Sequence, residues 1–173
     1  PGDVLTFAAI GEAREFLAGN GNRFLLFKDV NTCYDAWELG SMYEKLPVSL
    51  DRAARVEIRE DADGAALIVE RTLGRSRLVQ KIFLGNDARR LDFITRLDWK
   101  ERHKLLNVAF PVNVYTAEAI EEIQFGYVKR PVHRSRQSDR DRYEVCSHRY
   151  TVLQDGGAGA AVLNDCKYGV STA

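Results

Sequence analysis

The stretch RVEIREDADGAALIVERTLGRSRLVQKIFL, residues 55–84, decides the fold class. Val56 and Ile58 alternate with charged residues, and a period of two is typical of a strand that turns one face toward a core. Gly64 and Gly74 stand in DADG and LGRS, the polar breaks between these runs, where hairpin loops need small residues. The stretch therefore predicts consecutive antiparallel strands.

Strand patterns continue along the chain. RLDFITRLDW (90–99) repeats the period of two, and KLLNVAFPV (104–112) is apolar on both faces, as in a strand buried between two layers. TAEAIEEI (116–123) fits a strand and equally one or two helical turns. We expect a single all-β domain over residues 1–173, built as an antiparallel β-sandwich. A strand that begins near GVSTA and then stops predicts a truncated sandwich, a piece of a longer polypeptide.

The composition excludes two classes of partner. Lys plus Arg and Asp plus Glu both total 25, so the formal net charge is zero and a nucleic-acid partner is not indicated. The arginine-rich stretch RPVHRSRQSDRDR (130–142) lacks the aromatic residues on which bases stack, and a solvated or domain-contacting loop explains it better. No apolar run approaches the roughly 20 residues of a membrane helix. We expect neither nucleic acid nor membrane as a partner.

The cysteines and histidines suggest no reactive centre. The chain has three cysteines, an odd number, at the widely spaced positions Cys33, Cys146 and Cys166. We therefore expect buried free thiols in a reducing cytoplasm. Cys166 as a nucleophile would need a base, and His148 is the nearest histidine in sequence, but a buried structural thiol is the favoured interpretation. The histidines show no metal-ligand spacing, and the chain contains no phosphate-binding or dinucleotide-binding motif.

Two polar stretches are candidate sites. KDVNTCYDAWEL (28–39) combines carboxylates with aromatic rings, as sugar-binding clefts do. Its alternative interpretation is a strand exit with a buried Trp37 and the acids in water, which composition alone favours. VLNDCKYG (162–169) places five polar side chains in succession, Asn164 to Tyr168, with no base, metal or partner acid in evidence. It is either a catalytic cluster or a crowded polar loop.

The stretch DFITRLDWKERHKLLNVAFPVNVYTAEAIEEIQFGYVKRPVHR (92–134) resembles the all-β, C-terminal region of the α-mannosidases of glycoside hydrolase family 38, most closely the cytosolic type. YEVCSHRY and VLNDCKYG add to the resemblance, and so does NRFLLFKDVNTCYDAWEL, which contains the Asp-Ala-Trp signature at 35–37. The chain departs from the family at Ser138, where a tryptophan is usual, and at Asn31, where proline is common.

The resemblance implies a galactose mutarotase-like supersandwich within a retaining exo-α-mannosidase in the cytoplasm. In that family the nucleophile and the divalent metal, usually zinc, lie in an N-terminal (β/α) barrel, and nothing in this chain matches the barrel motifs. We therefore expect no catalytic residue, metal ligand or cofactor in this chain, and no mannosidase activity from it alone. Its partners would be its own barrel, a mannose-containing oligosaccharide and, as often in the family, further copies of the enzyme.

The resemblance also implies that sandwich loops line the outer substrate cleft. The residues expected to line it are Asp29, Tyr34, Asp35, Trp37, Asn164, Asp165, Lys167 and Tyr168. Two further hypotheses stay open, a free-standing carbohydrate-binding module and a structural domain without ligand contact. A module would bind sugar without the barrel, whereas a structural domain would expose a broad apolar patch instead.

Overall fold

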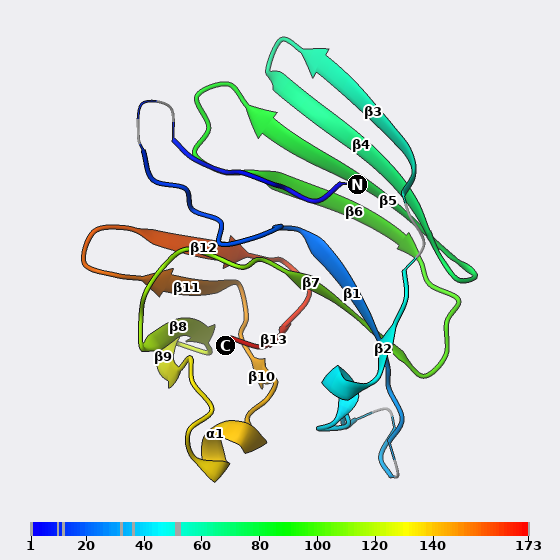
Figure 1. Cartoon of the computed structure of the whole chain (residues 1–173), viewed down its shortest axis with the longest axis vertical. Helices are drawn as coiled ribbons and strands as arrows, with labels where there is room; N and C mark the ends of the chain where they lie inside the picture. The colour runs from blue at the N-terminus through cyan, green and yellow to red at the C-terminus, as the bar shows by residue number, and fades with distance from the viewer. Residues whose placement is uncertain are drawn as a thin grey trace. The chain divides into compact units, whose positions relative to one another are not determined.

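The chain folds into two compact units, residues 1–111 and 112–173, which are described in turn. The computed structural model (Figure 1) describes residues 2–9, 11, 13–31, 33–35, 37–50 and 53–172, with backbone only at 53, 54 and 61. Ala36 of the Asp-Ala-Trp signature therefore lies outside the described residues. Within the described ranges, no helix is long and apolar enough to cross a membrane.

The first unit contains two antiparallel sheets. One has the order β3-β4-β5-β6, formed by β3 (Ala53–Asp61), β4 (Gly64–Leu73), β5 (Ser76–Gly85) and β6 (Asp92–Asp98). The other has the order β2-β1-β7, formed by β1 (Arg23–Lys28), β2 (Pro47–Val48) and β7 (Lys104–Ala109). A short 3₁₀ helix, Tyr43–Lys45, precedes β2.

The glycine-marked breaks are tight hairpins, as the sequence predicts. Asp61 pairs with Gly64 at the β3–β4 turn, and Leu73 pairs with Ser76 at the β4–β5 turn. Gly74 has a φ of 64°, and a Cβ added there would lie 2.8 Å from Oε1 of Glu101. Both the left-handed backbone and the close approach require glycine at this turn.

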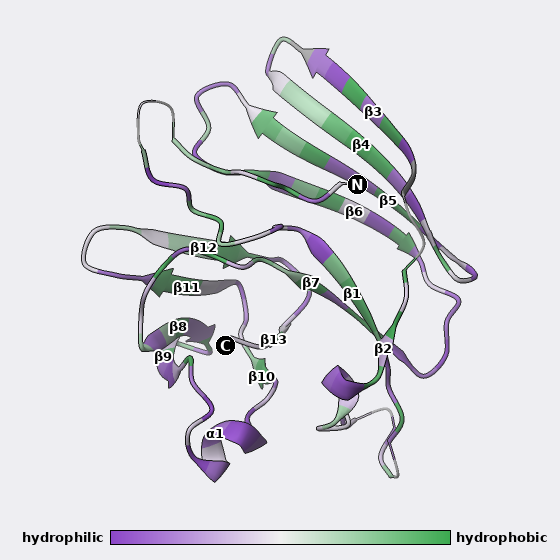
Figure 2. Ribbon diagram, in the orientation of Figure 1, coloured by the Kyte–Doolittle hydropathy of each residue, from purple (hydrophilic) through white to green (hydrophobic). Residues whose placement is uncertain are grey.

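The core of this unit lies between its two sheets. Phe24 of β1 packs with Leu73 of β4 and Leu78 of β5, and Leu50 and Leu106 pack against them. Figure 2 shows apolar and polar residues alternating along β3, as expected when only one face of a sheet is buried. The first unit is therefore a two-sheet sandwich.

The second unit has one larger and one smaller sheet. The larger sheet has the order β12-β11-β8-β9, formed by β8 (Glu118–Ile123), β9 (Gly126–Pro131), β11 (Tyr150–Gln154) and β12 (Gly159–Leu163). The smaller one pairs β10 (Val145–Cys146) with β13 (Gly169–Val170), and a single helix, α1 (Gln137–Asp141), lies between β9 and β10 in sequence.

The all-β prediction is confirmed, with strands in antiparallel sheets and few helical residues. Residues 116–123 adopt the strand alternative, as β8, and the arginine-rich stretch contains α1. The prediction of β7 as a strand buried on both faces is wrong, because most of its side chains are half-buried and Val108 is exposed. The single domain over 1–173 stays a prediction.

The expectation of buried cysteines is wrong. Cys33, Cys146 and Cys166 are all exposed. Cys146 lies in a two-residue strand, and Cys166 lies in the loop between β12 and β13, so neither reaches a core. The preference of cysteine for protein interiors is statistical, and here the local fold overrides it.

Candidate functional site

The candidate residues of the first unit follow β1 directly. Asp29 begins the segment, and its backbone N–H donates to the carbonyl oxygen of His103 at 2.9 Å. Oδ1 of Asp35 lies 3.6 Å from Nδ1 of the same histidine. His103, which directly precedes β7, therefore contacts this segment at two points, Asp29 and Asp35.

Asp29 and Asp35 line one open hollow of about 300 Å³. The other residues that line it are Trp99, Glu101, Arg102, His103 and Lys104. Oδ1 of Asp29 is buried and has no hydrogen-bond partner among the described residues. The hollow therefore carries both acidic and basic side chains beside one aromatic ring.

The two aromatic candidates of this segment point into solvent. Trp37 is 92% exposed and Tyr34 is 74% exposed, and neither lines the hollow. The alternative interpretation of Trp37 as a buried residue is therefore wrong. The carbonyl oxygen of Tyr34 accepts hydrogen bonds from the backbone N–H groups of Trp37 and Glu38, at 2.8 and 3.0 Å, which holds this part in a tight turn.

Glu101 is the most strongly anchored side chain in the wall of the hollow. Its carboxylate pairs with the ammonium group of Lys104 and accepts a hydrogen bond from the backbone N–H of Arg75 at 2.6 Å. These contacts, that of Lys104 first, lower the pKa of Glu101 below its usual value. Glu101 is therefore a fixed negative charge, already matched by its neighbours.

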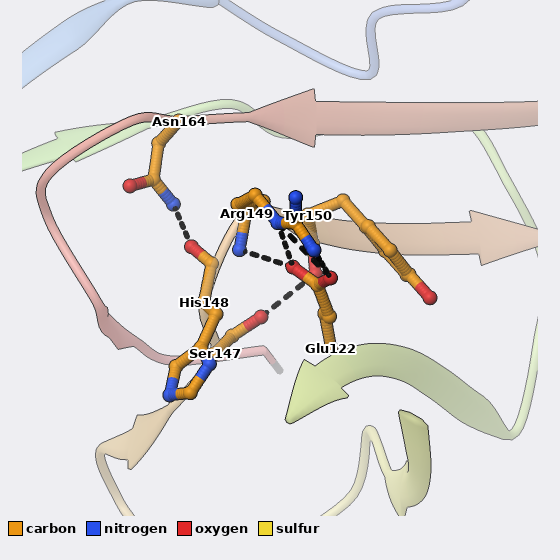
Figure 3. Close-up of polar contacts among 6 residues, drawn as sticks. All are labelled: Glu122, Ser147, His148, Arg149, Tyr150 and Asn164. Atoms are coloured by element: carbon orange, nitrogen blue, oxygen red, sulfur yellow. Dashed lines mark hydrogen bonds and ion pairs between the residues drawn. The ribbon is translucent and has the colours of Figure 1, made fainter. Parts of the chain in front are cut away.

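The candidate residues of the second unit lie in the loop between β12 and β13, and Asn164 shapes it. Oδ1 of Asn164 accepts hydrogen bonds from the backbone N–H groups of Cys166 and Lys167, at 3.1 and 2.8 Å. Its Nδ2 donates to the carbonyl oxygen of His148 at 2.7 Å (Figure 3). An Asn side chain that accepts a hydrogen bond from the backbone N–H two residues ahead forms an Asx turn. The side chain of Asn164 therefore stabilises the backbone conformation of the loop.

The remaining loop side chains are exposed. Asp165, Lys167 and Tyr168 are all open to solvent, and the ring of Tyr168 lies 5.2 Å from that of His148, centroid to centroid. Hydrogen bonding to Asp165 raises the pKa of the Cys166 thiol. A raised pKa opposes thiolate formation, so this cysteine is not an activated nucleophile. The arrangement presents a polar loop and no catalytic cluster.

Sequence reasoning missed the ion pair that supports this loop. Nη2 of Arg149 lies 2.8 Å from Oε1 of Glu122, and the Arg149 backbone N–H donates to Oε2 at 2.7 Å (Figure 3). The Arg149 side chain is the main cause of the lowered pKa of Glu122, and Glu122 raises the pKa of Arg149 in return. The carbonyl oxygen of Arg149 accepts from the N–H of Asn164 at 2.9 Å, which connects the pair to the loop.

One signal in the sequence could have revealed this pair. Glu121 and Glu122 are consecutive in β8, and consecutive side chains of a strand point to opposite faces. Both glutamates are buried, so each needs a cation on its own side of the sheet. Glu121 pairs with Arg130 and Glu122 pairs with Arg149.

No metal centre forms among these residues. Across the described part of the chain, no three His, Cys, Asp or Glu side chains gather closely enough to hold an ion. The zinc that the resemblance implies therefore does not fit a ligand set here, and we assign no metal chemistry to these side chains.

Comparison with known proteins identifies the family. The model of the C-terminal domain of glycosyl hydrolases family 38 matches residues 2–173. The chain belongs to this family. As a family 38 C-terminal domain, it is 36% identical over 176 aligned residues to alpha-mannosidase 2C1 of Homo sapiens, with 98% of this chain and 17% of that protein covered.

Two further alpha-mannosidases are similarly related to this chain. Alpha-mannosidase G of Dictyostelium discoideum is 34% identical over 88% of this chain and 14% of its own length. Alpha-mannosidase of Saccharomyces cerevisiae is 31% identical over 87% of this chain and 15% of its own length. The chain thus spans about a sixth of the length of the curated relatives that it matches, and it corresponds to their C-terminal domain.

Proposed function

We propose that this family 38 domain is the non-catalytic C-terminal β region of a longer α-mannosidase that removes terminal α-D-mannose from oligosaccharides. The domain supports the catalytic barrel, and its exposed loops line the outer part of the substrate cleft. The observation that carries the proposal is the loop after β12. Asn164 fixes its backbone, and Lys167 and Tyr168 project from it into solvent.

The chemistry of this loop suits a sugar. The ammonium group of Lys167 donates hydrogen bonds to hydroxyl oxygens, and the phenol of Tyr168 combines a polar tip with an apolar ring face. A backbone held by Asn164 loses little conformational freedom when a ligand binds, which improves affinity. These groups bind and orient a mannoside, and bond cleavage belongs to the barrel.

The loop proposal is tested by kinetics of the longer enzyme. Lys167→Ala and Tyr168→Phe should raise KM several-fold, or change the preference among mannosidic linkages, while kcat changes little. Lys129→Ala is the matched control, because Lys129 is an exposed lysine on a strand of the same unit. Unchanged kinetics in both loop variants would reject the lining role and leave a purely structural loop.

The segment after β1 is also proposed to line the substrate cleft, through Asp29, Tyr34, Asp35 and Trp37. The partners would be the barrel and a mannose-containing oligosaccharide, with zinc bound by residues outside this chain. The relationship to alpha-mannosidase 2C1 and the three exposed cysteines support a cytoplasmic location. Assembly into a homo-oligomer, like the location, stays a proposal.

The domain alone is proposed to be inactive. A zinc-dependent release of nitrophenol from a nitrophenyl α-mannoside by the purified 173-residue chain would overturn this part of the proposal. The control is the same assay after a metal chelator, which separates enzymatic from spontaneous release.

A free-standing carbohydrate-binding module is the second candidate. The observation that favours it is the high exposure of Trp37 and Tyr34, which are close in sequence to two acids that line an open hollow. Calorimetry of the chain with mannose and mannobiose decides between the two. Heat of binding that is lost in Trp37→Ala supports the module, and its absence supports the cleft-lining domain.

A further inference from the structure

The core-facing side of the first sheet is left uncovered at its edge strand, β3. Val56 pairs with Val69 of β4, and Ile58 pairs with Leu67. Paired residues point to the same face of a sheet, so Val56 and Ile58 lie on the face that carries the core. Val69 is only 2% exposed, yet Val56 is 47% and Ile58 73% exposed.

The opposite face of β3 shows which side belongs in water. Glu57 bonds Arg55 and Arg59, each at 2.8 Å, and all three side chains lie on that outer face. A strand with charges on one side and β-branched apolar residues on the other is built to bury its apolar side. Two exposed apolar side chains on the inner side therefore indicate a missing cover.

The first described residue, Gly2, lies beside this uncovered area. A Cβ added to Gly2 would lie 3.0 Å from Cγ1 of Val69, so the backbone at Gly2 rests directly on β4. Nδ2 of Asn22 donates to the carbonyl oxygen of Gly2 at 3.0 Å, and Val4 pairs with Gly21. In Figure 1 the N-terminal segment runs over the strands of this sheet.

We infer that the residues that precede Pro1 in the longer polypeptide cross the inner face of β3 and cover Val56 and Ile58 with apolar side chains. This rests on the proposal that the chain is part of a longer α-mannosidase, whose relatives are about six times its length. Neighbouring strands lie about 4.8 Å apart and an extended residue spans about 3.3 Å, so two to four residues reach from β4 across β3.

The geometry favours this occupant over a second copy of the chain. Val56 is the strand partner of Val69, on which Gly2 already rests. A segment that precedes Gly2 is therefore already next to the uncovered side chains. A second copy that joined the sheet by pairing with the free edge of β3 would meet the charged side chains of Arg55 and Arg59. Charged side chains on edge strands oppose such pairing between molecules.

The test is a cycle of thermal unfolding measurements on the chain and on the same chain extended by its ten preceding native residues, each with and without Ile58→Thr. The extension should raise Tm by several degrees. Ile58→Thr should lower the Tm of the extended chain by roughly 3 to 6 °C and that of the shorter chain by less than about 1 °C. Threonine keeps the branching at Cβ that suits a strand, while it is shorter and replaces apolar surface with a hydroxyl.

Ile94→Thr is the matched control. Ile94 is 63% exposed, a fraction similar to that of Ile58. It lies on the other edge strand of the same sheet, and its pairing with Lys81 places it on the outer face. Its effect on Tm should be the same with and without the extension. An effect specific to Ile58 and to the extension supports the inference.

Three results would overturn it. An equal loss of Tm in both chains would mean that Ile58 is already covered, and no loss in either would mean that the extension does not reach it. A dimer of the shorter chain in sedimentation equilibrium that Ile58→Thr dissociates would identify a second copy as the cover. The kinetics of the Lys167 variants do not depend on these outcomes, so the cleft-lining proposal is tested independently of this inference.

Discussion

Glu122 and Arg149 are 27 positions apart in sequence, yet the carboxylate of one accepts both a side-chain and a backbone hydrogen bond from the other, at 2.8 and 2.7 Å. The carbonyl oxygen of Glu122 also accepts from the backbone N–H of His148 at 2.9 Å. A single strand position thereby fixes the start of β11 and, through Asn164, the loop that follows β12.

Glu122→Gln should lower the melting temperature of the chain. The amide keeps the shape of the side chain but removes the negative charge that Arg149 meets, and the side chain is largely buried. Differential scanning calorimetry measures the change. Glu118→Gln, an exposed position on the same face of β8, should leave the melting temperature within error. Equal losses in the two variants would contradict the assigned role of Glu122.

Glu101 should make stability depend on pH in the acidic range. Lys104 and the Arg75 N–H hold its folded pKa below its usual value near 4.5, so the unfolded chain binds its proton first as pH falls. Its stabilising contribution is complete above that value and is lost as pH falls through the lower folded pKa. Urea unfolding at pH 7, 5, 4 and 3 should show a smaller acid loss in Glu101→Gln, and parallel curves would reject the assignment.

Asn164→Ala should free the backbone of the loop between β12 and β13. The amide protons of Cys166 and Lys167 lose their acceptor, and their hydrogen exchange should accelerate by about tenfold or more. Asn164→Asp keeps an acceptor oxygen and should keep most of the protection. Asp155→Ala, which removes the acceptor of Gly157 and Ala158 in another turn, is the control that should leave Cys166 and Lys167 unchanged.

Gly74→Ala should destabilise the first unit by about 1 to 2 kcal/mol, because alanine is strained at positive φ and its Cβ would meet Glu101. Gly126→Ala is the matched variant, since a Cβ there meets nothing within 4 Å. Chemical denaturation measures both free energies of unfolding. A loss at Gly126 as large as that at Gly74 would show that the turn geometry is not the cause.

The fold class follows from local patterns that the sequence displays openly. In RVEIRE the alternation of charged and apolar residues places Val56 and Ile58 on one face, and the register with β4 confirms it. Gly64 and Gly74 mark the hairpins because turns restrict backbone conformation within a few residues. Such features need no knowledge of distant segments.

The supports of the candidate site are harder to predict because they depend on pairing between distant strands. Thr151 pairs with Glu121, so β11 joins β8 although β9, α1 and β10 lie between them in sequence, and no local pattern specifies that partner. The exposure of Trp37 likewise depends on where its segment runs after β1. The eight expected lining residues stay predictions, although Asp29 and Asp35 do border one hollow.

The Asx turn at Asn164 separates the shape of its loop from the chemistry that the loop displays. The Asn164 side chain bonds the backbone of Cys166, Lys167 and His148, and none of these three hydrogen bonds uses the side chain of Asp165, Lys167 or Tyr168. These three positions can therefore change charge, size or polarity without a new backbone conformation. Under the proposed cleft-lining role, these three positions are where the sugar preference of the longer enzyme is open to engineering.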